Sequence, residues 1–178
     1  VEKVLKQLDF CDRGCNAVPV DILVAIGTGT IHELTRYCAV EYGIPFVSVP
    51  TAASGDSFAT AVAAITWDGM KKTFPAVAPE WILADTDIFS KAPYRLTAAG
   101  ISDLMGTYTA LIDWKVANLL TGEYICPEIC NLQEEMIKNT ERELDDIRDR
   151  DTESMEKLMY ALILSGLHMQ MACTSRPI

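Results

Sequence analysis

The chain has 178 residues, of which 49% are hydrophobic and 22% are charged, and its 25 acidic residues against 15 basic ones give a formal net charge of −10. This composition excludes an intrinsically disordered protein, because a chain of this length and apolar content buries enough surface to offset the entropy of ordering. The acidic balance argues against nucleic-acid binding, which needs a basic face, since no basic run is longer than Lys71-Lys72.

The first ten residues predict an amphipathic helix, with Val4, Leu5 and Leu8 among charged neighbours. No capping residue precedes this helix, so we expect the sequence to open inside a domain. The cysteines have no CxxC spacing, and no signal peptide or membrane-spanning run accompanies them, which predicts reduced thiols in a cytoplasmic protein. They are Cys11, Cys15, Cys38, Cys126, Cys130 and Cys173.

Residues 21–50 predict a strand–helix–strand unit. The apolar run within Asp21–Ile26 indicates a strand buried on both faces, and a helix follows from about Ile31 to Glu41. Gly43-Ile44-Pro45 ends that helix, and Phe46–Pro50 is a second buried strand.

The turn Gly27-Thr28-Gly29-Thr30 joins the first strand to the helix. Glycines here let the backbone approach a pyrophosphate, whose charge the free amides of the first helical turn can hold. An ordinary turn in which glycine supplies a positive φ explains the same residues equally well. His32 follows on the first helical turn, where we expect a surface residue.

The loop Thr51–Asp56 leaves the second strand at its carboxyl end, where open parallel sheets bind ligands. Its small residues leave room for a cofactor ring. Thr51 and Ser54 can bond ribose or amide groups, and Asp56 can accept hydrogen bonds from substrate hydroxyls. The alternative is a helix N-cap provided by Ser54 or Asp56, which spacing alone favours.

The remaining chain predicts a hairpin, a strand and then helices. Ala63–Trp67 and Lys72–Phe74 flank an Asp68-Gly69 turn, and Trp81–Ala84 is a further strand. Beyond Ala92-Pro93 the apolar spacing changes to three and four, so an α/β part is followed by an all-α part. Predicted helices lie around Ile101–Leu119, from about Pro127 to Arg148, and from about Thr152 to Cys173.

Asp103 is a carboxylate near the start of the first of these helices. It ligates a metal or complements the helix dipole. Gly100 and Gly106 favour a site, because a glycine inside a helix costs about 1 kcal/mol relative to alanine and indicates the close approach of another group. His168 is expected to be a satisfied core histidine.

Met155, Leu158, Met159 and Leu162 share a helical face in the last predicted helix. Such a face serves either the protein's own core or a homo-oligomer, and a core is the more frequent outcome.

Taken together, the ordered motifs resemble the glycerol-1-phosphate dehydrogenases, within the superfamily of iron-type alcohol dehydrogenases, glycerol dehydrogenase and dehydroquinate synthase. The motifs are Gly27–Leu34, Pro50–Thr60, Lys71–Thr73, Ala84–Ile88, Ala92–Pro93, Ala98–Asp103, Tyr108–Lys115, Ala161–Gly166 and Ser175–Pro177. The resemblance implies a dehydroquinate synthase-like fold. Residues 1–93 would be the C-terminal part of a Rossmann-like NAD(P)-binding α/β domain, and residues 94–178 the first helices of a metal-binding helical domain.

The resemblance further implies reversible reduction of dihydroxyacetone phosphate to sn-glycerol 1-phosphate with NADH or NADPH. One divalent metal ion, Zn²⁺ or Ni²⁺ with Fe²⁺ less favoured, would be held by an Asp and two His and would polarise the substrate oxygens. The implied partners are this small phosphorylated substrate and further copies of the chain in a dimer or larger homo-oligomer.

The resemblance also implies site residues. Asp56 would contact substrate, and Asp103 would be the catalytic residue that serves both metal and substrate. Cofactor contacts would come from Gly27, Gly29, Thr30, Ile31, His32, Glu33, Thr51, Ala52, Ala53, Ser54 and Thr60.

Several departures from the family pattern bear on function. The two metal-binding histidines of the family lie just beyond a segment like Ser175–Pro177, so we expect an internal piece of a chain roughly twice as long, inactive alone. Ile101, Ser102 and Thr107 replace Phe, Gly and Lys, and the lost cation would weaken binding of an anionic ligand. A glycerol dehydrogenase, a dehydroquinate synthase-like enzyme and a non-catalytic descendant remain alternatives.

Overall fold

The structure, a computed structural model, describes residues 4–6 and 20–177. The predicted helix over Val1–Phe10 falls mostly outside this range, and only its helical residues 4–6 are described. Cys11 and Cys15 also lie outside the described residues, whereas the other four cysteines are free thiols.

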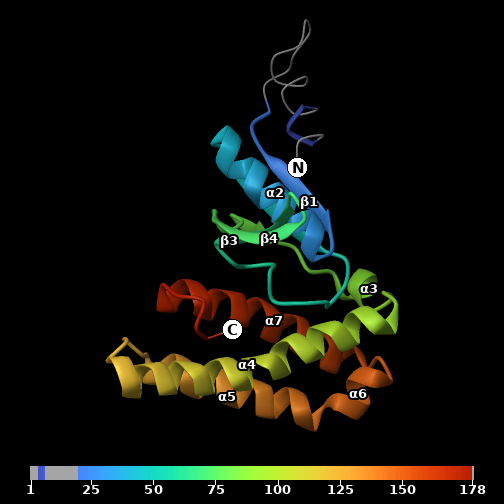
Figure 1. The fold of residues 1–178 in the computed structure, drawn as a ribbon. Coiled ribbons are helices and arrows are strands. Elements are labelled where there is room, and N and C mark those ends of the chain that lie inside the picture. The colour runs from blue at the N-terminus through green and yellow to red at the C-terminus, as the bar shows by residue number, and fades with distance from the viewer. Residues whose placement is uncertain (1–3, 7–19, 178) are drawn as a thin grey trace, which may run out of the picture.

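An α/β unit lies against a layer of helices (Figure 1). Its parallel sheet has the order β1-β2-β5, formed by β1 (Leu23–Gly27), β2 (Phe46–Pro50) and β5 (Trp81–Ile82). Helix α2 (Gly29–Tyr42) connects β1 to β2 and ends at Gly43, whose φ of 65° is left-handed. The predicted strand–helix–strand unit is therefore confirmed.

The predicted hairpin is also confirmed. Strands β3 (Val62–Trp67) and β4 (Met70–Pro75) pair antiparallel around Asp68 and Gly69, with φ values of 50° and 78°. Two left-handed residues in a two-residue loop are what the twist of a hairpin requires.

Strand β1 is not buried on both faces, contrary to the prediction. Ala25 is buried against Ala39 of α2 and Phe46 of β2, whereas Val24 and Ile26 on the opposite face are 52% and 64% exposed. An apolar run is buried on both faces only where both faces have packing partners, and among the described residues α2 covers one face of this edge strand.

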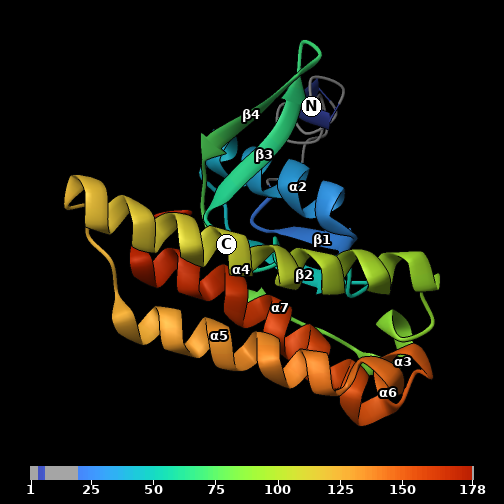
Figure 2. The same cartoon turned by 60° about the horizontal axis from the view of Figure 1, so that its bottom comes forward.

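The second half is helical, as predicted. It contains α3 (Thr86–Phe89), α4 (Tyr94–Thr121), α5 (Pro127–Arg142), α6 (Leu144–Arg148) and α7 (Thr152–Ala172). The expected single helix over Pro127–Arg148 is wrong, because Glu143, with φ −104° and ψ 9°, separates α5 from α6. Helices α4, α5 and α7 lie side by side (Figure 2).

The main core lies among these helices. Met155, Leu158, Met159 and Leu162 are buried there, so their face forms the chain's own core. Phe58, from the segment between β2 and β3, is buried in the same core and anchors that segment on the helices. No helix within residues 4–6 and 20–177 is long and apolar enough to cross a membrane.

Candidate functional site

A cleft of about 650 Å³ lies where the first turn of α2, the segment after β2, the hairpin and α4 meet. Many of the predicted site residues line it together, namely Gly29, Thr30, Glu33, Ser54, Asp56, Thr60 and Asp103. The predicted cofactor residues outside its lining are Gly27, Ile31, His32, Thr51, Ala52 and Ala53. Residues 54–57 and Thr60 therefore form one wall of a cavity large enough for a small ligand.

The two glycines of the β1–α2 turn are needed for close packing. A Cβ atom at Gly27 would lie 2.7 Å from Cγ1 of Ile31, and one at Gly29 would lie 3.1 Å from Oγ of Ser57. Neither glycine has a positive φ, so that explanation of the motif is wrong. The amides of Ile31 and His32 bond to the Thr28 carbonyl oxygen, so those of Gly29 and Thr30 precede the first hydrogen bonds of the helix and can bind an anion.

His32 is fully buried, so its predicted surface position is wrong. Its Nδ1 lies 2.9 Å from the Thr28 carbonyl oxygen, and its ring meets the Phe58 ring edge-on with centroids 5.0 Å apart. The tertiary fold places Phe58 against this face of α2. Burial lowers the pKa of His32, so the imidazole is neutral at pH 7.

We expect the buried His32 to make stability depend on pH. Its pKa is lowered in the folded protein, so the unfolded protein binds the proton more readily. The free energy of unfolding is therefore highest above the unfolded pKa of about 6.5 and decreases as the pH falls below it. Urea unfolding of the native protein and of H32N, measured from pH 8 to pH 5, should show the native midpoint falling relative to that of H32N. A constant difference over this range would contradict the assignment.

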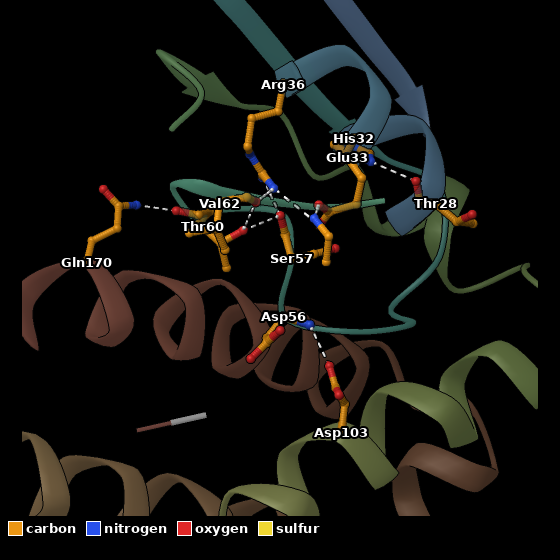
Figure 3. A network of polar contacts seen from close by, with 12 residues as sticks. Thr28, His32, Glu33, Arg36, Asp56, Ser57, Thr60, Val62, Asp103 and Gln170 are labelled. Atoms are coloured by element: carbon orange, nitrogen blue, oxygen red, sulfur yellow. Dashed lines mark hydrogen bonds and ion pairs between the residues drawn. The ribbon is translucent and has the colours of Figure 1, made fainter. Parts of the chain in front are cut away.

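Arg36 is a buried cation that the sequence analysis missed. Its guanidinium donates to the carbonyl oxygens of Ser57 and Val62 and forms a 3.3 Å ion pair with Glu33 (Figure 3). The second carboxylate oxygen of Glu33 accepts from the amide of Ala64. Burial lowers the pKa of Arg36 and raises that of Glu33, while their attraction opposes both changes. The pair holds both the segment after β2 and the hairpin of β3 and β4 against α2.

Asp56 and Asp103 meet at one end of the cleft (Figure 3). The Asp56 amide donates to Oδ2 of Asp103 at 2.9 Å. Burial first, and then the neighbouring charge of Asp103, raises the pKa of the Asp56 carboxyl to about 7. No helix starts after this segment, because residues 56–60 form turns before β3, so the N-cap explanation of Ser54 and Asp56 is wrong.

Glycines on two helices let this segment approach closely. A Cβ at Gly100 of α4 would lie 2.3 Å from the Ala53 carbonyl oxygen, and one at Gly166 of α7 would lie 2.6 Å from the Asp56 carbonyl oxygen. The close approach predicted at Gly100 is therefore confirmed. The close approach predicted at Gly106 is wrong, since no atom outside its own helical backbone lies within 4 Å of a Cβ built there.

The positive charge of the cleft comes from another position than the one the family pattern gives. Thr107, which replaces a Lys of the family pattern, is buried, and its hydroxyl donates to the Leu104 carbonyl oxygen at 2.6 Å. Among the described residues that line the cleft, Lys71 of β4 carries the positive charge. The sequence analysis gave Lys71 no role, although strand alternation separates it from Lys72.

His168 is buried as predicted but is not satisfied. Its Nδ1 has no hydrogen-bond partner among the described residues, and burial lowers its pKa.

A family model described as iron-containing alcohol dehydrogenase matches residues 2–93. The chain belongs to this family. Glycerol-1-phosphate dehydrogenase (NAD(P)+) of Bacillus licheniformis is 42% identical over 160 residues, which are 90% of this chain and 40% of the relative. The enzyme of the same name from Pyrococcus horikoshii is 36% identical over 177 residues, which are 99% of this chain and 49% of the relative. The chain thus spans less than half the length of these family members.

Solved structures share the fold of this chain. A probable glycerol dehydrogenase from Sinorhizobium meliloti superposes with a TM-score of 0.76 at 22% identity, covering 94% of this chain and 48% of that one. The glycerol dehydrogenase of Schizosaccharomyces pombe gives a TM-score of 0.74 at 23% identity, and the match covers 94% of this chain and 43% of that one. The predicted fold class, α/β followed by all-α, is confirmed.

The metal ion that the family implies is not fully provided for here. A catalytic zinc takes three protein ligands and keeps one position open. Within the described parts of the chain, no three His, Cys, Asp or Glu side chains group closely enough to hold a metal ion. Asp56 and Asp103 supply carboxylate oxygens to the cleft, and these are part of such a ligand set.

Proposed function

We propose that the protein is an NAD(P)-dependent dehydrogenase that interconverts dihydroxyacetone phosphate and sn-glycerol 1-phosphate. The observation that carries this proposal is the 42% identity, over 90% of the chain, to a relative named for this activity. The cleft supports it, because one cavity is lined both by two carboxylates and by a helix N-terminus that can bind phosphate. In this proposal, residues 1–93 belong to the cofactor domain and residues 94–178 to the helical domain.

In the proposed site, the chain's own residues bind and orient two ligands. The amides of Gly29 and Thr30 hold the cofactor pyrophosphate, and small residues at positions 52–55 leave space beside it. NAD(P)H supplies the hydride when it is bound. Asp56 accepts a hydrogen bond from a substrate hydroxyl, and Asp103 fixes the Asp56 backbone and contacts substrate.

The proposal is tested with the full-length gene product. NADH and NADPH oxidation with dihydroxyacetone phosphate is measured with chelator, and then with added Zn²⁺ or Ni²⁺. We expect turnover that chelation abolishes and metal restores. Turnover with dihydroxyacetone, but not with its phosphate, would favour a glycerol dehydrogenase, and no turnover with either would favour a non-catalytic descendant.

Asp103 is expected to be required for this turnover. D103N should reduce kcat/KM by roughly 10- to 100-fold or more, because the amide removes a charge from the site. D113N alters an exposed carboxylate on the same helix and should leave kcat/KM unchanged. Equal kcat/KM values for the two variants would exclude a catalytic role for Asp103.

Lys71 is expected to bind a phosphate group of cofactor or substrate. K71M should weaken that binding about tenfold, the loss expected for one charge-assisted hydrogen bond. K72M is the matched control, because Lys72 does not line the cleft. Kd values for NADH and NADPH and the KM for dihydroxyacetone phosphate show which ligand Lys71 contacts. If K71M and K72M give equal values for all three, Lys71 does not bind phosphate.

Finer features stay predictions. The proposal includes the contacts of the individual cofactor residues, Zn²⁺ or Ni²⁺ as the metal, a homo-oligomer and a cytoplasmic location. The metal-restoration experiment, together with size determination of the full-length gene product, addresses the metal and the oligomer.

A further inference from the structure

Two buried polar residues form a chain of hydrogen bonds that ends on Asp56. Gln133 of α5 and Ser165 of α7 are both 0% exposed. Nε2 of Gln133 donates to Oγ of Ser165 at 3.3 Å, and this hydroxyl donates to Oδ2 of Asp56 at 3.1 Å. The Asp56 side chain accordingly points toward α7 (Figure 3). Helix α5 is thus linked through α7 to the carboxylate of the segment after β2.

The chemistry of Gln133 fixes the direction of these bonds. An amide nitrogen can only donate, so its proton occupies a lone pair of Ser165 Oγ, and the hydroxyl proton turns toward Asp56. The same nitrogen also donates to the carbonyl oxygen of Pro177 at 3.1 Å. Because that carbonyl can only accept, a flipped amide would face it with a second acceptor. Pro177 therefore holds the amide in the orientation that serves Ser165.

We propose that Gln133 and Ser165 are positioning residues that orient the Asp56 carboxylate for a hydroxyl-bearing substrate. The role in substrate binding rests on the proposed function. Ser165 donates to Oδ2 and restrains the carboxyl plane beside Asp103. We assign to Oδ1 of the ionised carboxylate the hydrogen bond from the substrate hydroxyl. The adjacent Gly166 brings the α7 backbone against the Asp56 carbonyl oxygen, so main chain and side chain of Asp56 are fixed by the same helical turn.

The test is kinetic and uses the full-length gene product. S165A should raise the KM for dihydroxyacetone phosphate about tenfold, the loss expected for one hydrogen bond to a charged group, and Q133M, which acts through Ser165, should raise it by a smaller factor. The Kd for NAD(P)H should not change, and S165T, which keeps the hydroxyl, should restore the KM. S154A makes the same substitution at a buried position of α7, where the backbone amide bonds Asp151 rather than Asp56, and its KM should stay native. A native KM for S165A overturns the proposal, even if Q133M does not fold.

A second measurement separates this proposal from the proposed function. If the native protein does not turn over dihydroxyacetone phosphate, the proposed function fails, and the hydrogen-bond chain is judged by urea unfolding. S165A should lower the unfolding midpoint in the native background and have a much smaller effect in the D56A background, because the partner is already gone. Equal shifts in the two backgrounds would overturn the positioning of Asp56 by Ser165.

Discussion

Replacing Gly100 by alanine is expected to lower both stability and activity strongly. The new Cβ would lie 2.3 Å from the carbonyl oxygen of Ala53 and 2.9 Å from its carbon, and backbone atoms cannot move aside as a flexible side chain can. Helix α4 and the segment that carries Asp56 must therefore separate. Overpacking of this kind costs about 1–3 kcal/mol, and a displacement of about 1 Å in a catalytic site can reduce turnover about 100-fold.

The matched control lies on the same helix. A Cβ at Gly106 meets nothing within 4 Å, and its φ is not left-handed, so G106A should stabilise the protein by up to about 1 kcal/mol through helix propensity. Urea unfolding and kcat/KM of the full-length gene product measure both effects. Equal behaviour of G100A and G106A would contradict the close packing of α4 against Ala53.

Replacing Arg36 by methionine is expected to have the largest effect on stability. The substitution leaves the partly buried Glu33, whose side chain is 13% exposed, without its ion-pair partner and removes the donors to the carbonyl oxygens of Ser57 and Val62. Breaking a buried ion pair in this way costs about 3–5 kcal/mol. Because these bonds hold the hairpin and the segment after β2 against α2, cofactor binding should weaken as well.

Two further variants serve as controls for R36M. R36K keeps the charge but not the planar fork of donors, so its stability should lie between those of native protein and R36M. R148M removes an exposed arginine that pairs with Asp145 and should leave the unfolding midpoint nearly unchanged. If R36M unfolds at the same urea concentration as R148M, the buried pair does not stabilise the fold.

The fold was predictable wherever local spacing decides structure. Asp68-Gly69 between two β-forming runs specifies a hairpin turn, and the spacing of apolar residues specifies α4 and α7. Burial was predicted less well. The apolar residues of β1 and the polar His32 have local patterns that do not reveal which neighbours cover them. A strand without a packing partner on one face stays exposed, and a first-turn histidine under Phe58 is buried.

The candidate site was predictable as a set of segments but not as a geometry. The β1–α2 turn, the segment after β2 and the start of α4 were each identified from residue type and position. Arg36 was missed, although it lies one helical turn from His32 on the face that becomes buried. A charged residue at core spacing was an available signal, and the ion-pair partner at i−3 was another.

The sequence by itself determined most elements and their order, the hairpin turn, and three of the segments that form the cleft, because these depend on neighbours along the chain. Only the tertiary structure decided that Asp56 and Asp103, 47 residues apart, share a hydrogen bond, and that Ser165, itself bonded by Gln133 of another helix, donates to Asp56. The reason is physical. Hydrogen bonds and close contacts between distant segments depend on how helices pack, and packing is set by the whole set of buried side chains.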